Sequence, residues 1–176
     1  MLNSSRHLLF AATVSASLLL AACGGGGDAP ATDSAATDAA DTPAAGGAVD
    51  QMALGQTKYG QVCASCHMAD GNGSPGVFPP LAGSEWVNGD PVIPISIVLH
   101  GLQGPIDVKG TRYEGAMQPW GMIPDSDIAA ILTYVRASFG NSSSPVTTEQ
   151  VTAVRQAEGD RVAWTADELK AKYPGS

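Results

Sequence analysis

The chain has 176 residues, and its 17 acidic residues outnumber its nine Lys and Arg to give a formal net charge of -8. Once the low-complexity N-terminal stretches are set aside, this length supports one small domain. The acidic balance argues against nucleic acid as a partner.

Residues 1–22 have the pattern of a signal peptide. Arg6 precedes an apolar run at 8–20 that is too short to span a membrane comfortably. The run ends in Leu-Ala-Ala-Cys, which resembles the bacterial lipobox and predicts acylation of Cys23, in preference to an ordinary leader cysteine. We therefore expect export to the periplasmic side of the cell envelope and attachment to a membrane through lipid.

Residues 23–50 predict a disordered, flexible tether. The segment is dominated by Ala, Gly, Thr and Asp and contains no aromatic residue, so it cannot bury enough apolar surface to fold. A coil of this length spans roughly 30 Å. Gly24 stands where an aspartate would resemble an inner-membrane retention signal, which favours the outer membrane of a Gram-negative cell.

Three helices are predicted in the central region, and no strand pattern competes with them. The first runs from Met52 to Cys63 and the second over residues 94–102, with a Gly- and Pro-rich loop at 70–89 between them. The third and clearest runs over residues 125–139, with Asp125 as its cap and a glycine at its end.

Residues 142–176 predict a C-terminal extension of two short helices. Thr147 with Gln150, and Thr165 with Glu168, each have the spacing of a capping box. The extension is either a partner surface or a brace for the domain.

Cys63-Ala-Ser-Cys66-His67 matches C-x-x-C-H, the attachment signal for a c-type haem. Two thiols one helical turn apart can each add to a vinyl group of one macrocycle, and the following imidazole can then bind the iron. A zinc knuckle would need a second pair of ligands, and a thioredoxin-like redox pair would need a strand, turn and helix setting. Neither pattern is present, so we predict one covalent haem.

The second axial ligand of the iron has several candidates. Met68 adjoins His67 and cannot reach the opposite face of the ring, and Met52 on the first helix is better explained by core packing. Met117, in a Gly- and Pro-containing loop, is the preferred candidate. Two alternatives remain open, Met122 and His100.

Together these features resemble the class I cytochrome c family over about residues 55–140. That resemblance implies an all-α, cytochrome c-like domain at 51–141 wrapped around one haem. It also implies roles for individual residues: Cys63 and Cys66 are thioether anchors, His67 the proximal ligand and Met117 the distal ligand. By the same resemblance, the carbonyl of Pro79 is expected to accept the second N–H of the proximal histidine. Pro80 competes for this role, and a simple turn proline is the alternative for Pro79.

The segment LHGLQGPI at 99–106, with Tyr113 and Met117 and then TYVR at 133–136 and Gly140-Asn141, is similar to a narrower group. Its members accompany quinoprotein dehydrogenases, copper nitrite reductases or terminal oxidases. One departure is that Gln118 separates the methionine from Pro119, where the family commonly has Met-Pro. Leu81, Trp86, Trp120 and Tyr134 are candidates to line the haem pocket, with ordinary core packing as the alternative.

Filled axial positions leave no open site for substrate, so we predict a one-electron carrier between redox partner proteins, and no enzyme activity of its own. One alternative is a fixed cytochrome subunit of a periplasmic dehydrogenase, nitrite reductase or oxidase. The other is a haem peroxidase or gas-binding cytochrome, although no distal His and Arg pair accompanies the methionine.

Overall fold

The computed structural model describes residues 45–175, and it describes their side chains from residue 50. The predicted signal peptide at 1–22, the lipidation site Cys23 and the tether up to residue 44 lie outside the described residues. The described residues belong to one compact unit. Within them, no helix combines the length and the apolar character needed to cross a membrane.

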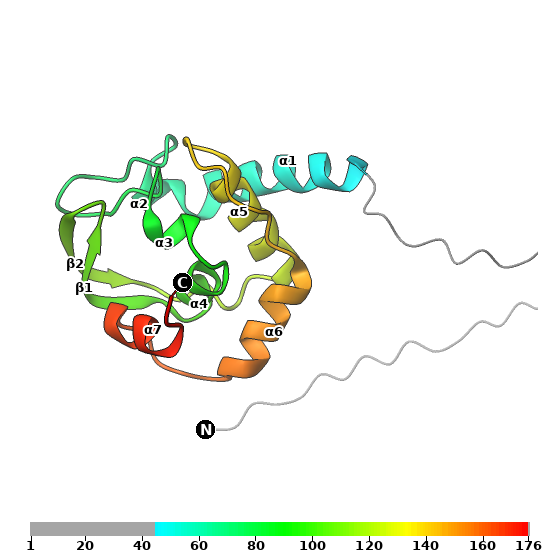
Figure 1. Cartoon of the computed structure of the whole chain (residues 1–176). Coiled ribbons are helices and arrows are strands. Elements are labelled where there is room, and N and C mark those ends of the chain that lie inside the picture. Colours follow the sequence, from blue (N-terminus) through cyan, green and yellow to red (C-terminus); the bar gives the residue numbers. More distant parts are fainter. Residues whose placement is uncertain (1–44, 176) are drawn as a thin grey trace, which may run out of the picture. The chain divides into compact units, whose positions relative to one another are not determined.

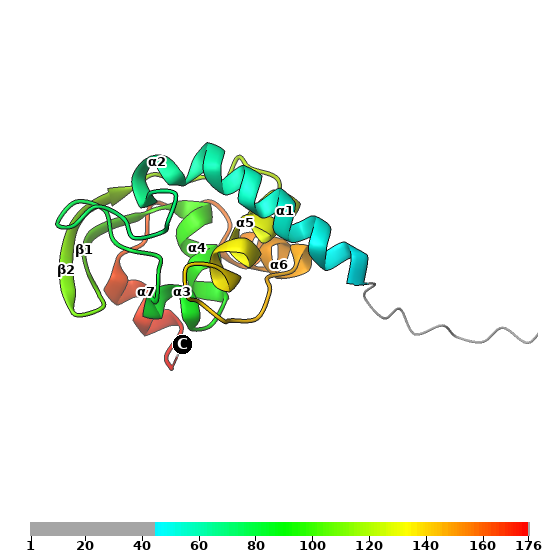
Figure 2. The ribbon, with the colours of Figure 1, turned by 90° about the horizontal axis from the view of Figure 1, so that it is seen from above.

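Helix α1 (Ala45–Val62) crosses helix α5 (Asp125–Ala137), as Figures 1 and 2 show. The crossing is close because of Gly55, where an added Cβ would lie 2.1 Å from the carbonyl oxygen of Ala130. The helix begins seven residues before the predicted start at Met52, so it occupies the end of the range 23–50 assigned to the tether. This first turn was not predicted because it contains two glycines, which disfavour a helix. Adding such a turn costs little free energy once the rest of the helix has formed.

Three shorter helices follow: α2 (Ala64–His67), α3 (Glu85–Asn88) and α4 (Val92–His100). The predicted helix at 94–102 corresponds to α4 but ends two residues earlier. Gly101 has φ +80, a left-handed conformation that ends the helix and turns the chain into a strand.

A β-hairpin was not predicted. Strands β1 (Leu102–Val108) and β2 (Thr111–Met117) pair antiparallel, with Leu102 opposite Met117 and Val108 opposite Thr111. Gly104 and Pro105 disfavour a strand locally, although three apolar side chains of β1 are buried: Leu102, Ile106 and Val108. Helices still dominate the fold, so the predicted class is confirmed with this hairpin added.

Helix α5 begins at Asp125 as predicted, but its cap differs. Pro124 occupies the N-cap position, and the Asp125 carboxylate accepts hydrogen bonds from Thr152 and Arg155 instead. The helix ends at Ala137 because Phe139 and Gly140 both have positive φ values.

The C-terminal extension packs into the same core as the rest of the domain. Helix α6 (Thr148–Glu158) and helix α7 (Ala166–Lys172) both have the predicted capping boxes. In Figure 1, α6 lies beside α4 and α5, and α7 lies beside the hairpin. Trp164 connects the extension to the hairpin, because its backbone pairs with β1 at Leu102 and its ring is buried. The extension is therefore part of the packed core of the domain.

Candidate haem site

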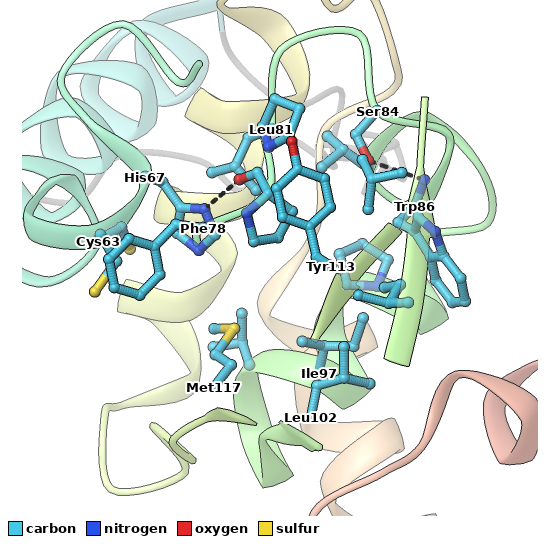
Figure 3. Close-up of a pocket in the computed structure, with 18 of the residues that line it drawn as sticks. Cys63, His67, Phe78, Leu81, Ser84, Trp86, Ile97, Leu102, Tyr113 and Met117 are labelled. Atoms are coloured by element: carbon cyan, nitrogen blue, oxygen red, sulfur yellow. Dashed lines mark hydrogen bonds between the residues drawn. The ribbon is translucent and has the colours of Figure 1, made fainter. Parts of the chain in front are cut away.

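One cavity of about 520 Å³ collects the chemistry-bearing residues predicted from the sequence (Figure 3). Cys63, Cys66, His67 and Met117 all line it. The rest of the wall is mainly apolar and comes from the loop after α2, from α3, α4 and α5, from both strands and from the segment after β2. It includes Leu81, Trp86, Ile97, Leu102, Ile106, Trp120 and Ile131. The cavity is therefore suited to a large, mainly apolar ligand such as a flat ring system, and it offers that ligand few polar groups.

The attachment motif is held by a continuation of helix α1. The Cys63 amide donates to the Tyr59 carbonyl at 2.8 Å, and the His67 amide donates to the Cys63 carbonyl at 2.9 Å. This turn brings both thiols and the imidazole to one cavity wall. Cys63 and Cys66 form no disulfide. Before attachment, burial and, to a smaller extent, the neighbouring Cys66 raise the pKa of the Cys63 thiol to about 11.

The His67 ring is oriented by Pro79. Its Nδ1 atom lies 3.0 Å from the Pro79 carbonyl oxygen, as the dashed line in Figure 3 shows. A carbonyl can only accept, so Nδ1 carries the proton and Nε2 keeps its lone pair. Burial lowers the pKa of His67, and the Pro79 contact only partly opposes this, so the neutral form of the ring is favoured. Pro80 also lines the cavity, but the hydrogen bond goes to Pro79.

Tyr59 supports the attachment motif through a hydrogen bond and through ring contacts. Its place in the predicted helix did not indicate this role. Its ring is 2% exposed, and its hydroxyl donates to the Met68 carbonyl at 2.6 Å, just after the motif. The ring also contacts Tyr134 and Phe139, with centroids 5.6 and 5.3 Å away. Tyr134 belongs to this aromatic cluster and does not line the cavity, unlike Leu81, Trp86 and Trp120.

Asn141 organises the loop that carries Leu81, and its role was also missed. Its side-chain nitrogen donates to the carbonyls of Leu81 and Val135, at 3.1 and 2.8 Å. Its side-chain oxygen accepts from the Gly83 amide and from Asn88, both at 2.8 Å. One nearly buried amide thus satisfies polar groups from three segments, and no local sequence pattern reveals such a network.

Met117 reaches the cavity from the end of β2, and not from a loop as predicted. In Figure 3 its sulfur points toward the side of the cavity on which His67 lies. The alternatives lie elsewhere: the Met122 side chain is 86% exposed, and Nε2 of His100 lies 3.0 Å from a carboxylate oxygen of Glu158. Neither residue lines the cavity, and neither do Met52 and Met68.

These residues fit a covalent haem. The two thiols lie on the same wall as an imidazole whose Nε2 is available, and a thioether enters from a separate element. The apolar lining suits a macrocycle and keeps water away from it. In such a site Cys63 and Cys66 would attach the ring, and His67 and Met117 are placed to bind its iron.

Comparison with known proteins agrees with this chemistry. The family model described as cytochrome c matches residues 52–138. The chain is 39% identical to cytochrome c-552 of Thermus thermophilus over 119 residues, which cover 62% of this chain and 80% of that protein.

Two further relatives are subunits of larger enzymes. The chain is 33% identical to the fructose dehydrogenase cytochrome subunit of Gluconobacter japonicus, covering 57% of this chain and 22% of that protein. It is 31% identical to the gluconate 2-dehydrogenase cytochrome c subunit of Pantoea cypripedii, covering 62% and 25%. The chain belongs to the cytochrome c family, whose members carry covalently bound haem c and transfer electrons.

Proposed function

We propose that this cytochrome is an exported, lipid-anchored electron carrier whose iron is bound by His67 and Met117. One observation supports the ligand pair above all others: the described structure brings Met117, but neither Met122 nor His100, to the cavity that holds His67. Export and lipidation rest on the sequence, through the short apolar run at 8–20 and Cys23 at its end.

The residues of the site prepare it for electron transfer. When bound, the haem supplies one-electron chemistry by cycling its iron between ferric and ferrous states. His67 is held in one tautomer by Pro79, which fixes the direction of the Nε2 lone pair. The apolar wall would shield the ring from water, and Met117 as second iron ligand would leave no open position for substrate or oxygen.

The fixed-subunit alternative has support of its own, because relatives include cytochrome subunits of dehydrogenases. In that case, mild detergent extraction would recover this protein with a dehydrogenase in constant ratio. A mobile carrier would be recovered alone and would accept electrons from added donors.

The test uses the mature protein purified from membranes. Intact mass should show one haem and a diacylated or triacylated N-terminal Cys23. Spectra should show a c-type haem and, in the ferric state, the near-infrared sulfur-to-iron band. The absence of added haem mass would overturn the proposal, and loss of the sulfur-to-iron band alone would overturn Met117 as ligand.

A further inference from the structure

The segment that follows Met117 contributes residues to two different cavities. We call residues 118–124 the methionine loop. Gln118 and Trp120 line the haem cavity, whereas Gly121 and Met122 line a second cavity of about 400 Å³. Arg155 of helix α6 lines this second cavity too, so the C-terminal extension touches the back of the loop.

Arg155 binds the loop at two backbone carbonyls. Its Nη1 donates to the Gly121 carbonyl at 2.6 Å, and its Nη2 donates to the Ile123 carbonyl at 3.2 Å. The guanidinium also pairs with the Asp125 carboxylate at 2.7 Å, at the start of α5. Three acceptors spaced two residues apart therefore converge on one rigid planar donor.

Helix α4 holds the other side of the loop. The Trp120 amide donates to the Val98 carbonyl at 2.8 Å. At Gly121 an added Cβ would lie 2.8 Å from the Leu99 carbonyl oxygen and 3.5 Å from Nη1 of Arg155. The backbone at Gly121 is thus enclosed between α4 and the guanidinium, which limits the movement available to the loop.

We propose that Arg155 is a positioning residue that keeps Met117 on the iron by clamping the methionine loop from behind. The inference rests on the proposed function, because it takes Met117 as the distal ligand. It gives the C-terminal extension a role in the redox centre, although the extension contributes no residue to the haem cavity. Without the guanidinium, the carbonyls of Gly121 and Ile123 lose their shared donor. The loop can then move and carry the adjoining Met117 away from the iron.

The experiment compares full-length ferric holoprotein with the variants Arg155→Gln and Arg155→Lys. Each is heated while the sulfur-to-iron band and the far-ultraviolet helix signal are recorded together. In the Arg155→Gln variant the band should disappear roughly 5 °C or more below the loss of helix signal, whereas the two coincide in the parent protein. Reduced Arg155→Gln protein should also bind carbon monoxide about tenfold faster or more, the factor for one lost hydrogen bond to a charged group. The Arg155→Lys variant should be intermediate, since it keeps the charge but not the fork of donors.

Two control variants separate positioning from general stability. Val151→Ala removes buried apolar volume from the same helix and leaves every Arg155 contact in place, so it should lower both transitions together. Arg112→Gln makes the same charge change on the exposed hairpin. It should leave the loss of the sulfur-to-iron band and the loss of the helix signal at the same temperature as each other. If Arg155→Gln lowered both transitions equally, as expected of Val151→Ala, the inference would be wrong. If the parent protein showed no sulfur-to-iron band, the proposed ligand itself would be wrong.

Discussion

The two sides of the haem cavity are built in opposite ways. The proximal side is local: both thiols and the imidazole lie within five residues, and one helical turn brings them together. The distal side is assembled from distant segments, since Met117 ends a strand paired with Leu102 while Arg155 and α4 hold the loop that follows. A contiguous motif can be recognised without the fold, whereas a composite wall exists only once the fold has formed.

The largest expected effect comes from removing the local side. The double substitution Cys63→Ser with Cys66→Ser should abolish covalent haem, because no thiol remains in the cavity to add to the macrocycle. Haem staining after denaturing electrophoresis measures this directly. Ser65→Ala, which alters an exposed hydroxyl between the two, should keep full staining. Haem staining of the double variant would show that the haem is attached elsewhere.

The distal side should be most sensitive where the strand begins. Gly101 has φ +80, and an added Cβ would lie 2.5 Å from the Met117 carbonyl oxygen. Gly110, in the hairpin turn, has φ +74 but open space around it. Gly110→Ala should therefore cost about 1–2 kcal/mol of backbone strain, and Gly101→Ala about 1–3 kcal/mol more from crowding.

Denaturant unfolding of both holoproteins measures the difference, and the sulfur-to-iron band reports on Met117. Only Gly101→Ala should weaken that band. Equal unfolding free energies, with an intact band in both, would show that the contact between Gly101 and Met117 places no demand on the ligand.

Two substitutions in helix α1 test whether the proximal side of the cavity also depends on tertiary packing. Gly55 lies at the crossing with α5, whereas an added Cβ at Gly60 would meet nothing within 4 Å. Gly60→Ala should stabilise the protein by about 1 kcal/mol through helix propensity. Gly55→Ala should destabilise it by about 1–3 kcal/mol through overpacking. Thermal unfolding gives the two signs, and matching signs would contradict the close crossing.

The smallest expected effect is a pH dependence at the start of α5. Burial raises the pKa of Asp125, but the hydrogen bonds from Thr152 and Arg155 outweigh it, so the net shift is downward. A carboxylate with a lowered pKa stabilises the folded state above its unfolded pKa of about 3.9 and loses this as the pH falls through the folded value. Asp125→Asn should thus cost no more than about 1 kcal/mol at pH 7.

That cost should shrink at pH 3, which lies below the unfolded pKa of about 3.9, because the unfolded chain is then protonated and the folded state loses part of the advantage of its ionised carboxylate. Urea unfolding at the two pH values measures it. A cost that stayed the same at both would show that the ionised carboxylate makes no contribution.

Much of the helical framework follows from sequence patterns. The capping boxes at Thr147 and Thr165 and the apolar face of α5 each depend on residues within one or two turns, so their spacing predicts them. The hairpin was missed because Gly104 and Pro105 disfavour a strand locally, and pairing with β2 and packing against Trp164 outweigh that preference.

By itself the sequence predicted the cofactor, and it named candidates for the attachment residues and the proximal ligand, because C-x-x-C-H places all of these groups in one helical turn. The tertiary structure separates the candidates for the distal ligand on new grounds, since the methionines are chemically alike but Met117 lines the haem cavity whereas Met122 is exposed. Tyr59, Asn141 and Arg155 came to light in the same way. Each holds backbone groups that lie far apart in the chain, and such hydrogen bonds leave no periodic trace in the sequence.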